Sequence, residues 1–463
     1  MADAEHQAGT TGAPANALLR TAAQTYGSQL GVAVLSLGNA LIVARSLGAV
    51  GRGEVAFLTA IAWLGSNIST FGVQEANVNL AAAEPHLRRS LATNSLILSV
   101  LLGAACAGAI AALVAIVPAA GGSASHLLLW LVLISLPMLI LSTYLRFLIQ
   151  GEYGFGVTNL AWLLPSVVNF SVNGALALAG VLSVGTAVAT WIAGQLLGTA
   201  IMARYVMRYS AGFGRPDLAL ARRTLSFGGK SHVGRIMLLA NYRLDQWILG
   251  AIAGPRELGL YSVAVAWAEA LFLLPTALSA VQRPDIVRSS RREAVRLTAR
   301  VFRVSLLATA AMAVGLIVLA PFLCVTIFGS EFRGSIFDLR VLALGAFGIV
   351  ALKQLGSSLT GRRRPTAASL SIACAFVCTV ALDFALIPSH GDAGAAIASS
   401  TAYTIGGVVI AIVFTRTLGG RAVDLVPRPS DARETWSRVR SALRRRRAEP
   451  ASAVEEATKT TAA

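Results

Sequence analysis

The sequence predicts an all-α polytopic membrane protein, with about 12 transmembrane helices in two parallel six-helix bundles. Of its 463 residues, 55% are hydrophobic and only 13% are charged. A soluble globular protein carries roughly 25% charged residues, and a spanning helix needs about 20 apolar residues, so the apolar residues suffice for about a dozen spans. This composition excludes a soluble enzyme and a disordered scaffold.

Apolar runs separated by charged, glycine or proline breaks predict the individual spans. They are 22–44, 54–76, 95–117, 127–148, 157–180, 184–206, 233–253, 258–280, 302–324, 336–358, 367–387 and 393–415. The predicted organisation is a polar N-terminus (1–17), a first bundle (18–208), a basic linker (209–230), a second bundle (231–417) and a basic tail (418–463).

Positive charge alternates along the loops. Loops after spans two, six, eight and ten contain arginine clusters, which include Arg88, Arg215 and Arg292, whereas loops after odd-numbered spans have few positive charges, chiefly Arg52, Arg256 and Arg333. Cytoplasmic loops collect Lys and Arg, so we expect a protein of the cytoplasmic membrane with both termini in the cytoplasm. This bias explains the net charge of +17. We therefore expect anionic lipids as partners and no nucleic acid.

An internal repeat is indicated by glycines spaced 206 residues apart at equivalent helix junctions. The pairs are Gly48 and Gly254, Gly53 and Gly259, and Gly185 and Gly391. Each half would hold six spans, so the halves would have the same orientation, with a substrate site between them.

The basic tail contains a short amphipathic pattern. Trp436, Val439 and Leu443 share one helical face beside several arginines. We expect a short interfacial helix on anionic lipid or, alternatively, a disordered tail.

No cofactor or metal site is predicted. The sequence contains no phosphate-binding P-loop, no H-E-x-x-H helix and no G-x-S-x-G elbow. Cys374 and Cys378 would share a helical face, but no histidine lies near them. A transporter is therefore expected rather than an enzyme.

Ionisable and amide side chains inside the spans are the candidate site residues, because charge is costly at membrane depth. The cations are Arg45, Arg243 and Lys353, and the carboxylates are Asp245, Glu269 and Glu75. The amides are Asn39, Asn67, Gln74, Asn159 and Asn173. The alternatives are snorkelling for the long cations, structural ion pairs for the carboxylates and helix–helix hydrogen bonds for the amides. Arg243 is two residues from Asp245, so the two share no helical face and each carboxylate needs another partner.

Several motifs resemble one family. The stretch Asn241–Gly250 (NYRLDQWILG) continues into Glu257–Ala264 (ELGLYSVA), then into Pro275 and Arg283-Pro284. Further matches are Ala44–Gly48 (ARSLG), Pro321-Phe322 with Phe328–Phe332 (FGSEF), and Ile387-Pro388 with Gly391 and Gly394–Ala396. Together they resemble the polysaccharide exporters, the Wzx-type flippases of the MOP superfamily.

The resemblance implies a MATE-like V of two bundles around a central cavity, which moves a lipid-linked oligosaccharide by alternating access. Polymerases or glycosyltransferases of the same pathway would be partners. In such a cavity, Arg45, Arg243 and Lys353 would bind the pyrophosphate, because buried anionic charge needs counter-charge. The amides would contact sugars, and Asp245, Glu269 and Glu75 would couple transport to an ion gradient or line the cavity. The alternatives are a cation-coupled multidrug antiporter of the same superfamily and a membrane enzyme of glycan assembly.

Overall fold

The computed structural model describes residues 15–431 except 211, 274, 277, 279–285, 287–288, 363 and 429, and every regular element in this part is helical. The residues before 15 and the predicted tail helix at Trp436 lie outside the described part. The chain forms two compact units. The first comprises Met1–Ala270, Leu319–Leu342 and Phe376–Ser399, and the second comprises Leu271–Val318, Ala343–Ala375 and Ser400–Ala463. The predicted boundaries of the two bundles stay a prediction.

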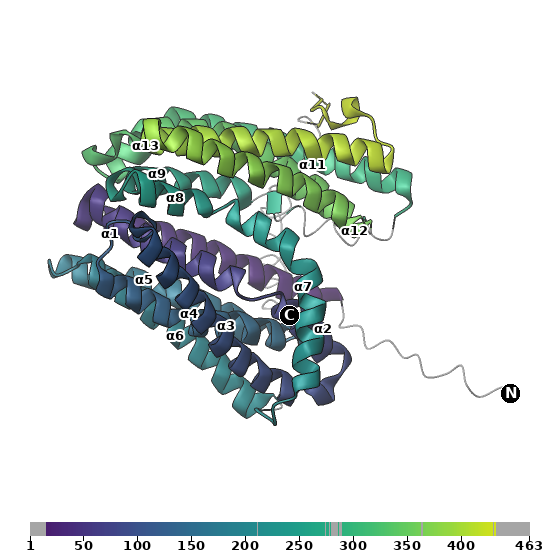
Figure 1. Cartoon of the computed structure of the whole chain (residues 1–463). Helices are drawn as coiled ribbons and strands as arrows, with labels where there is room; N and C mark the ends of the chain where they lie inside the picture. Colours follow the sequence, from purple (N-terminus) through teal and green to yellow (C-terminus); the bar gives the residue numbers. More distant parts are fainter. Residues whose placement is uncertain are drawn as a thin grey trace, which may run out of the picture. The chain divides into compact units, whose positions relative to one another are not determined.

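The helices follow the chain as shown in Figure 1. They are α1 (Ala15–Ile68), α2 (Val73–Ala83), α3 (Arg88–Ile116), α4 (His126–Gly151), α5 (Phe155–Leu178), α6 (Val184–Tyr209), α7 (Leu218–Ala240), α8 (Leu244–Ile252), α9 (Pro255–Ala268), α11 (Arg291–Pro321), α12 (Ser335–Gly361) and α13 (Pro365–Leu418). Short turns connect them, including η3 (Glu269–Phe272), the π-helical η4 (Phe322–Ile327), η5 (Ser330–Arg333) and η6 (Ala422–Leu425).

Among the described residues, eight helices are long and apolar enough to cross a membrane. Two of them, α1 and α13, join predicted spans without a loop: α13 contains spans eleven and twelve, and α1 contains span one and residues 54–68 of span two. Their helical path is broken only at Gly48 (φ 66°) and Gly391 (φ 54°), and such positive φ values are accessible mainly to glycine. The prediction of an all-α polytopic membrane protein is confirmed.

Two of the three predicted glycine pairs occupy equivalent structural positions. Gly48 and Gly254 share a positive φ with an extended ψ, at −172° and 178°. Gly53 and Gly259 sit where α1 and α9 meet backbone to backbone. A Cβ on Gly53 would overlap the carbonyl oxygen of Pro255, and a Cβ on Gly259 would overlap that of Ala49, which precedes Pro255 by the same 206 residues. This reciprocal contact supports an internal duplication.

The third pair differs in conformation. Gly391 is the kink inside α13, whereas Gly185 lies within the first turn of α6 and has no positive φ. The physical reason is local. Ser183 and Thr186 form a capping box that starts α6 as a separate helix, while α13 continues through its kink.

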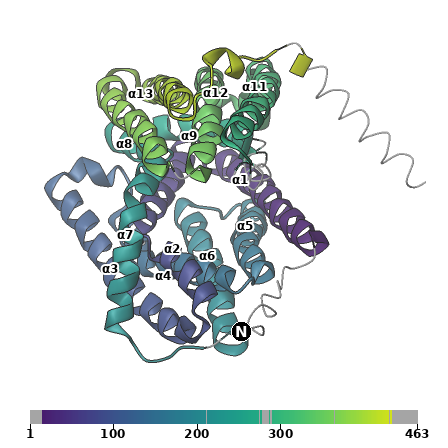
Figure 2. The ribbon, with the colours of Figure 1, turned by 90° about the vertical axis from the view of Figure 1, so that its right-hand side faces the viewer.

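Each unit has its own apolar core. In the first, Leu145, Leu148 and Ile149 of α4 pack with Met202 and Val206 of α6. Helix α7 lies against α2 and α3 (Figure 2). In the second unit, Val350 and Leu355 of α12 pack with Ile410 and Phe414 of α13. Nothing but hydrogen fits at Gly348, because a Cβ there would overlap the backbone of Tyr403. Such small residues allow membrane helices to approach closely.

Candidate functional site

Two helix breaks within the first unit position the charged candidates. Helix α7 ends at Ala240 and α8 begins at Leu244, so predicted span seven is interrupted. Helix α9 ends at Ala268 and is followed by the 3-10 turn η3, so predicted span eight is interrupted as well. Non-helical backbone at membrane depth is tolerated where protein buries it or where it lines a water-filled cavity. Broken helices of this kind form the substrate and ion sites of many transporters.

An ion pair joins the two breaks. Arg243 precedes α8, and its Nη2 lies 2.8 Å from Oε1 of Glu269, the first residue of η3. The Arg243 guanidinium also lies over the Trp63 ring of α1, at 5.9 Å from the ring centre. The two paired side chains are 28% and 43% exposed. Ionised groups within a span that keep this much exposure belong in a wet cavity rather than against lipid.

Arg52 is a further member of this group, and its predicted position in a loop is wrong. It lies in α1 just beyond the Gly48 kink, and its guanidinium interacts electrostatically with both Arg243 and Glu269. Its Nε is buried and has no hydrogen-bond partner among the described residues. Both guanidinium groups therefore lie within electrostatic range of Glu269, with which Arg243 forms the ion pair. We name Arg52, Arg243 and Glu269 the arginine pair site.

The other two predicted cations are bound elsewhere. Arg45 donates from Nε to the carbonyl of Ile327 at 2.7 Å and from Nη2 to the carbonyl of Thr326. Thr326 and Ile327 end the π-helical turn η4, where the last carbonyls have no partner within the helix, so the contact supports a structural role. In the second unit, Lys353 donates to Oγ1 of Thr276 at 2.9 Å and lies 5.3 Å from the Phe272 ring centre.

A second cationic cluster in the first unit contains the predicted Glu75. Its Oε1 lies 2.7 Å from Nη1 of Arg235 in α7. Arg235 and Arg146 both lie over the Phe147 ring, each at 5.6 Å from its centre, and Arg146 also lies 5.1 Å from the centre of the Trp162 ring. Arg235 was not predicted as a site residue, because the sequence carries no signal that its side chain would reach the Phe147 ring of α4.

The predicted Gln74 is fully buried, and neither of its amide atoms has a hydrogen-bond partner among the described residues. It neighbours Glu75 in α2. An unsatisfied buried amide is costly, so Gln74 retains hydrogen-bonding capacity that water or a ligand can meet.

A carboxylate cluster forms around Asp245, which is 2% exposed. Asp245 accepts hydrogen bonds from the backbone N–H of Gln246 at 2.7 Å, from the Tyr261 hydroxyl, and from the Ser399 hydroxyl at 3.2 Å. Arg243 pairs with Glu269 instead, in agreement with the expectation that Arg243 and Asp245 share no face.

Asp383 of α13 completes the cluster. It is fully buried, interacts electrostatically with Asp245, and receives no hydrogen bond from the described residues. One turn earlier in α13, Thr379 donates to Oδ1 of Asn241. The described residues contain no group of three or more His, Cys, Asp or Glu side chains arranged to hold a metal ion.

Four predicted sugar-contacting amides make bonds within the helical framework. Asn173 donates to Oδ1 of Asn39 at 2.8 Å, and Asn159 donates to Oγ1 of Thr25 at 3.1 Å, so both bonds join α5 to α1. Asn67 donates to the carbonyl of Trp63 in its own helix at 2.8 Å. The two bonds between α5 and α1 support the alternative of helix–helix bonding.

Solved structures of similar fold belong to transporters. One, described as "Inward-facing conformation of a multidrug resistance MATE family transporter of the MOP superfamily", has a TM-score of 0.68 at 12% identity, over 84% of this chain and 94% of the other. "Lipid II flippase MurJ, inward closed conformation" has a TM-score of 0.71 at 14% identity, over 87% and 88%. A MOP superfamily transporter from Pyrococcus furiosus has a TM-score of 0.58 at 12% identity, over 87% and 95%. These likenesses establish the fold.

A search of curated proteins finds no match. The family model described as "Polysaccharide biosynthesis protein" matches residues 18–290. This match confirms the resemblance indicated by the motifs around α7, α8 and α9. Because it spans more than half of the 463 residues, the chain belongs to the polysaccharide biosynthesis protein family.

Proposed function

We propose that this membrane protein moves a lipid-linked oligosaccharide across the cytoplasmic membrane by alternating access. The observation that carries the proposal is the arginine pair site, where Arg243 forms an ion pair with Glu269 and Arg52 lies within electrostatic range of both groups. A lipid-linked oligosaccharide carries its negative charge at a pyrophosphate linkage. Such a group can leave water only where counter-charge and hydrogen-bond donors replace its hydration, and guanidinium groups provide both with bidentate geometry.

Glu269 has a defined part in this mechanism. In the empty protein it neutralises Arg243 through the 2.8 Å contact. An arriving pyrophosphate competes with Glu269 for Arg243 and meets Arg52, whose Nε has no partner among the described residues. The exchange of one anion for another avoids a state with two uncompensated cations inside the membrane. Substrate binding therefore breaks the ion pair that joins α8 to η3. The loss of this contact allows the two elements to move during the change between facing states.

The second cationic cluster suits the sugars. Trp162 and Phe147 present aromatic faces beside Arg146 and Arg235. An aromatic face with a polar neighbour matches a sugar ring, which has apolar faces and hydroxyl edges. Gln74 adds an amide with unused hydrogen-bonding capacity.

We further propose that Asp245 and Asp383 couple transport to an ion gradient. Two carboxylates that interact in a buried site cannot both stay ionised without a proton or a cation. Asp383 has no donor among the described residues, so it is the group whose charge must be compensated from outside. Binding and release of that proton or cation would favour one facing state over the other, as an alternating-access transporter requires.

The proposal is tested by surface glycan in cells that depend on this protein. The variant Arg52→Gln/Arg243→Gln keeps polar side chains of similar length but removes both charges. We expect surface glycan to fall at least about tenfold while the protein remains in the membrane. The matched control is Arg256→Gln, because the Arg256 side chain is 63% exposed and only loosely paired, at 3.7 Å from Glu257. Normal surface glycan in the double variant would refute the proposal.

A further inference from the structure

Helix α11 of the second unit has two distinct parts. Its first turns contain Arg292, Arg296, Arg300 and Arg303, whose spacing of four, four and three residues places them along one face. The remaining 18 residues, 304–321, contain no charged residue. At about 1.5 Å per residue this part is roughly 27 Å long, close to the ~30 Å hydrocarbon thickness of a bilayer. The arginines nearest to it therefore lie at the level of the lipid headgroups.

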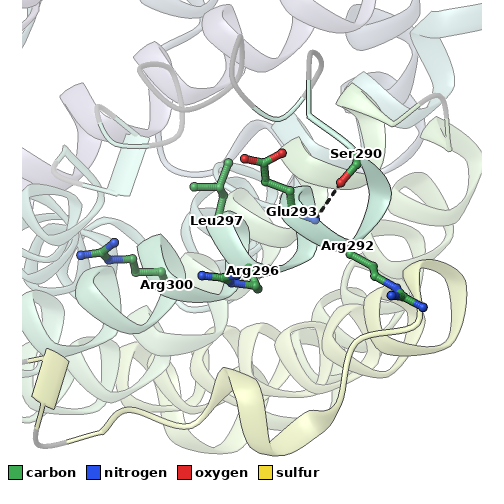
Figure 3. Close-up of a pocket in the computed structure, with 6 residues that line it drawn as sticks. All are labelled: Ser290, Arg292, Glu293, Arg296, Leu297 and Arg300. Atoms are coloured by element: carbon green, nitrogen blue, oxygen red, sulfur yellow. Dashed lines mark hydrogen bonds between the residues drawn. The ribbon is translucent and has the colours of Figure 1, made fainter.

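Two adjoining pockets border this arginine face. The first has a volume of about 360 Å³ and is lined by Ser290, Arg292, Glu293, Arg296, Leu297 and Arg300. Figure 3 shows its three arginines following one another along α11. The second, of about 440 Å³, lies between α11 and the segment after α13, and its charged lining is Arg296, Arg300, Arg303, Asp424, Arg428 and Asp431. Because Arg296 and Arg300 line both pockets, we treat the two as one site and name it the α11 arginine pocket.

The α11 arginine pocket has an excess of positive charge. Arg303 donates to both carboxylate oxygens of Asp431, at 2.7 and 3.0 Å. Arg428 donates to Asp424 at 3.0 Å. These two acids are therefore already neutralised. Glu293 is the one acidic residue that lines the first pocket, against three arginines.

Two of those arginines are available to a ligand. Arg292 and Arg296 are exposed and make no ion pair with the residues that the structure describes. The pocket therefore fits a compact anion that accepts several hydrogen bonds, and phosphate oxygens have the geometry that guanidinium groups bind best.

Apolar exposure beside the pocket indicates where the phosphate comes from. Val423 and Val426, in and just after η6, are 58% and 57% exposed. Asp424 lies between them and lines the pocket. Exposed valines next to a cationic pocket, at the end of a spanning helix, match the boundary between headgroups and acyl chains. A free phosphate ion would make no use of them.

We propose that the α11 arginine pocket binds the phosphate of an anionic phospholipid headgroup. Arg296 holds the phosphate, Arg292 and Arg300 contribute electrostatic attraction, and the acyl chains extend along the apolar part of α11. This site is independent of the oligosaccharide substrate and would anchor the beginning of α11 and the η6 segment to the membrane surface.

The test uses the full-length protein purified in neutral detergent. Binding of dioctanoyl phosphatidylglycerol, dioctanoyl phosphatidylcholine and inorganic phosphate is measured by calorimetry. We expect saturable binding of phosphatidylglycerol and at least about tenfold weaker binding of the other two. Arg296→Gln/Arg300→Gln should weaken phosphatidylglycerol binding by roughly 20-fold, since each basic residue at a membrane surface contributes about a factor of five. The control Arg215→Gln/Arg222→Gln removes two exposed arginines elsewhere and should leave the affinity unchanged.

Three outcomes would overturn the proposal. Phosphate binding as tight as phosphatidylglycerol binding would mean an anion site without lipid preference. An equal loss in the control variant would mean diffuse electrostatic attraction. Unchanged phosphatidylglycerol affinity in Arg296→Gln/Arg300→Gln would show that the lipid does not bind at the α11 arginine pocket. If Arg296→Gln/Arg300→Gln fails to fold, Arg292→Gln/Arg296→Gln replaces it, because those two side chains are exposed and make no ion pair with described residues. An affinity loss of about fivefold or more is then expected.

Discussion

Arg243 and Glu269 form an ion pair of 2.8 Å between two helix breaks. Arg243 occupies the non-helical position before α8, and Glu269 begins the 3-10 turn after α9. The pair thus connects the two interrupted spans of the first unit at the point where each lacks regular helical bonding.

Exchanging the two charges tests this connection. Arg243→Gln alone leaves Glu269 without its hydrogen-bonded partner, so we expect a loss of about 1–2 kcal/mol in the free energy of unfolding. The exchange Arg243→Glu/Glu269→Arg should recover part of that loss, because the opposite charges still meet. Thermal unfolding of the purified variants measures both. Additive losses in the exchange variant would show that the contact does not connect the helices.

Neutral variants of the two buried carboxylates should show whether these groups serve protein stability or ion coupling. Asp383→Asn replaces a carboxylate that lacks donors with an amide that can donate to Asp245, so we expect stability to be kept or raised. Asp245→Asn keeps the shape but removes titration. Flipping in liposomes should lose its dependence on an ion gradient in both variants, while substrate binding remains. Unchanged gradient dependence in both would defeat the coupling role, and loss of Asp245→Asn from the membrane would indicate a structural one.

The reciprocal glycine contact should tolerate no side chain. Gly53→Ala places a Cβ against the backbone carbonyl of Pro255, so α1 and α9 must separate. We expect a loss of about 1–3 kcal/mol and lower membrane abundance. Gly108→Ala is the matched control, since a Cβ there meets no atom within 4 Å and alanine favours the helix. Equal abundance of the two variants would contradict the close approach of α1 and α9.

The predicted orientation has a direct test in cysteine labelling. All four native cysteines, Cys106, Cys324, Cys374 and Cys378, are free, and their replacement gives a clean background. Single cysteines at the exposed positions 215 and 292 should resist an impermeant reagent added outside, whereas one at position 256 should react. Labelling of position 215 from outside would contradict the predicted topology.

The sequence pattern predicted the helices better than their contacts. Apolar run lengths placed most predicted spans on helices, although the structure interrupts spans two, seven and eight. The spacing of Gly53 and Gly259 anticipated a repeat that the backbone contact supports. Helix periodicity also showed that Asp245 must find partners other than Arg243. These features depend on local geometry and on the cost of burial, both of which are readable along one chain.

The contacts that were missed depend on the packing of distant helices. Arg52 was predicted to lie in a loop because the pattern of apolar runs and glycine breaks does not distinguish a glycine kink within a helix from a chain reversal. Arg235 had no sequence signal, since its value as a site residue comes from Phe147 in another helix. Asn173 and Asn39 were polar enough for a sugar site, but only the structure shows that they bind each other.

Binding of a polyprenyl pyrophosphate that carries no sugar is the most direct test of the arginine pair site. The purified protein should bind it, and should bind the uncharged polyprenol at least about tenfold more weakly. In Arg52→Gln/Arg243→Gln the affinity for the pyrophosphate lipid should fall by roughly 100-fold, since charged hydrogen bonds contribute about 1.5–3 kcal/mol each. The affinity for polyprenol should stay the same. Equal affinity of the native and double-variant proteins for the pyrophosphate lipid would contradict the claim that these two arginines recognise the substrate's charge.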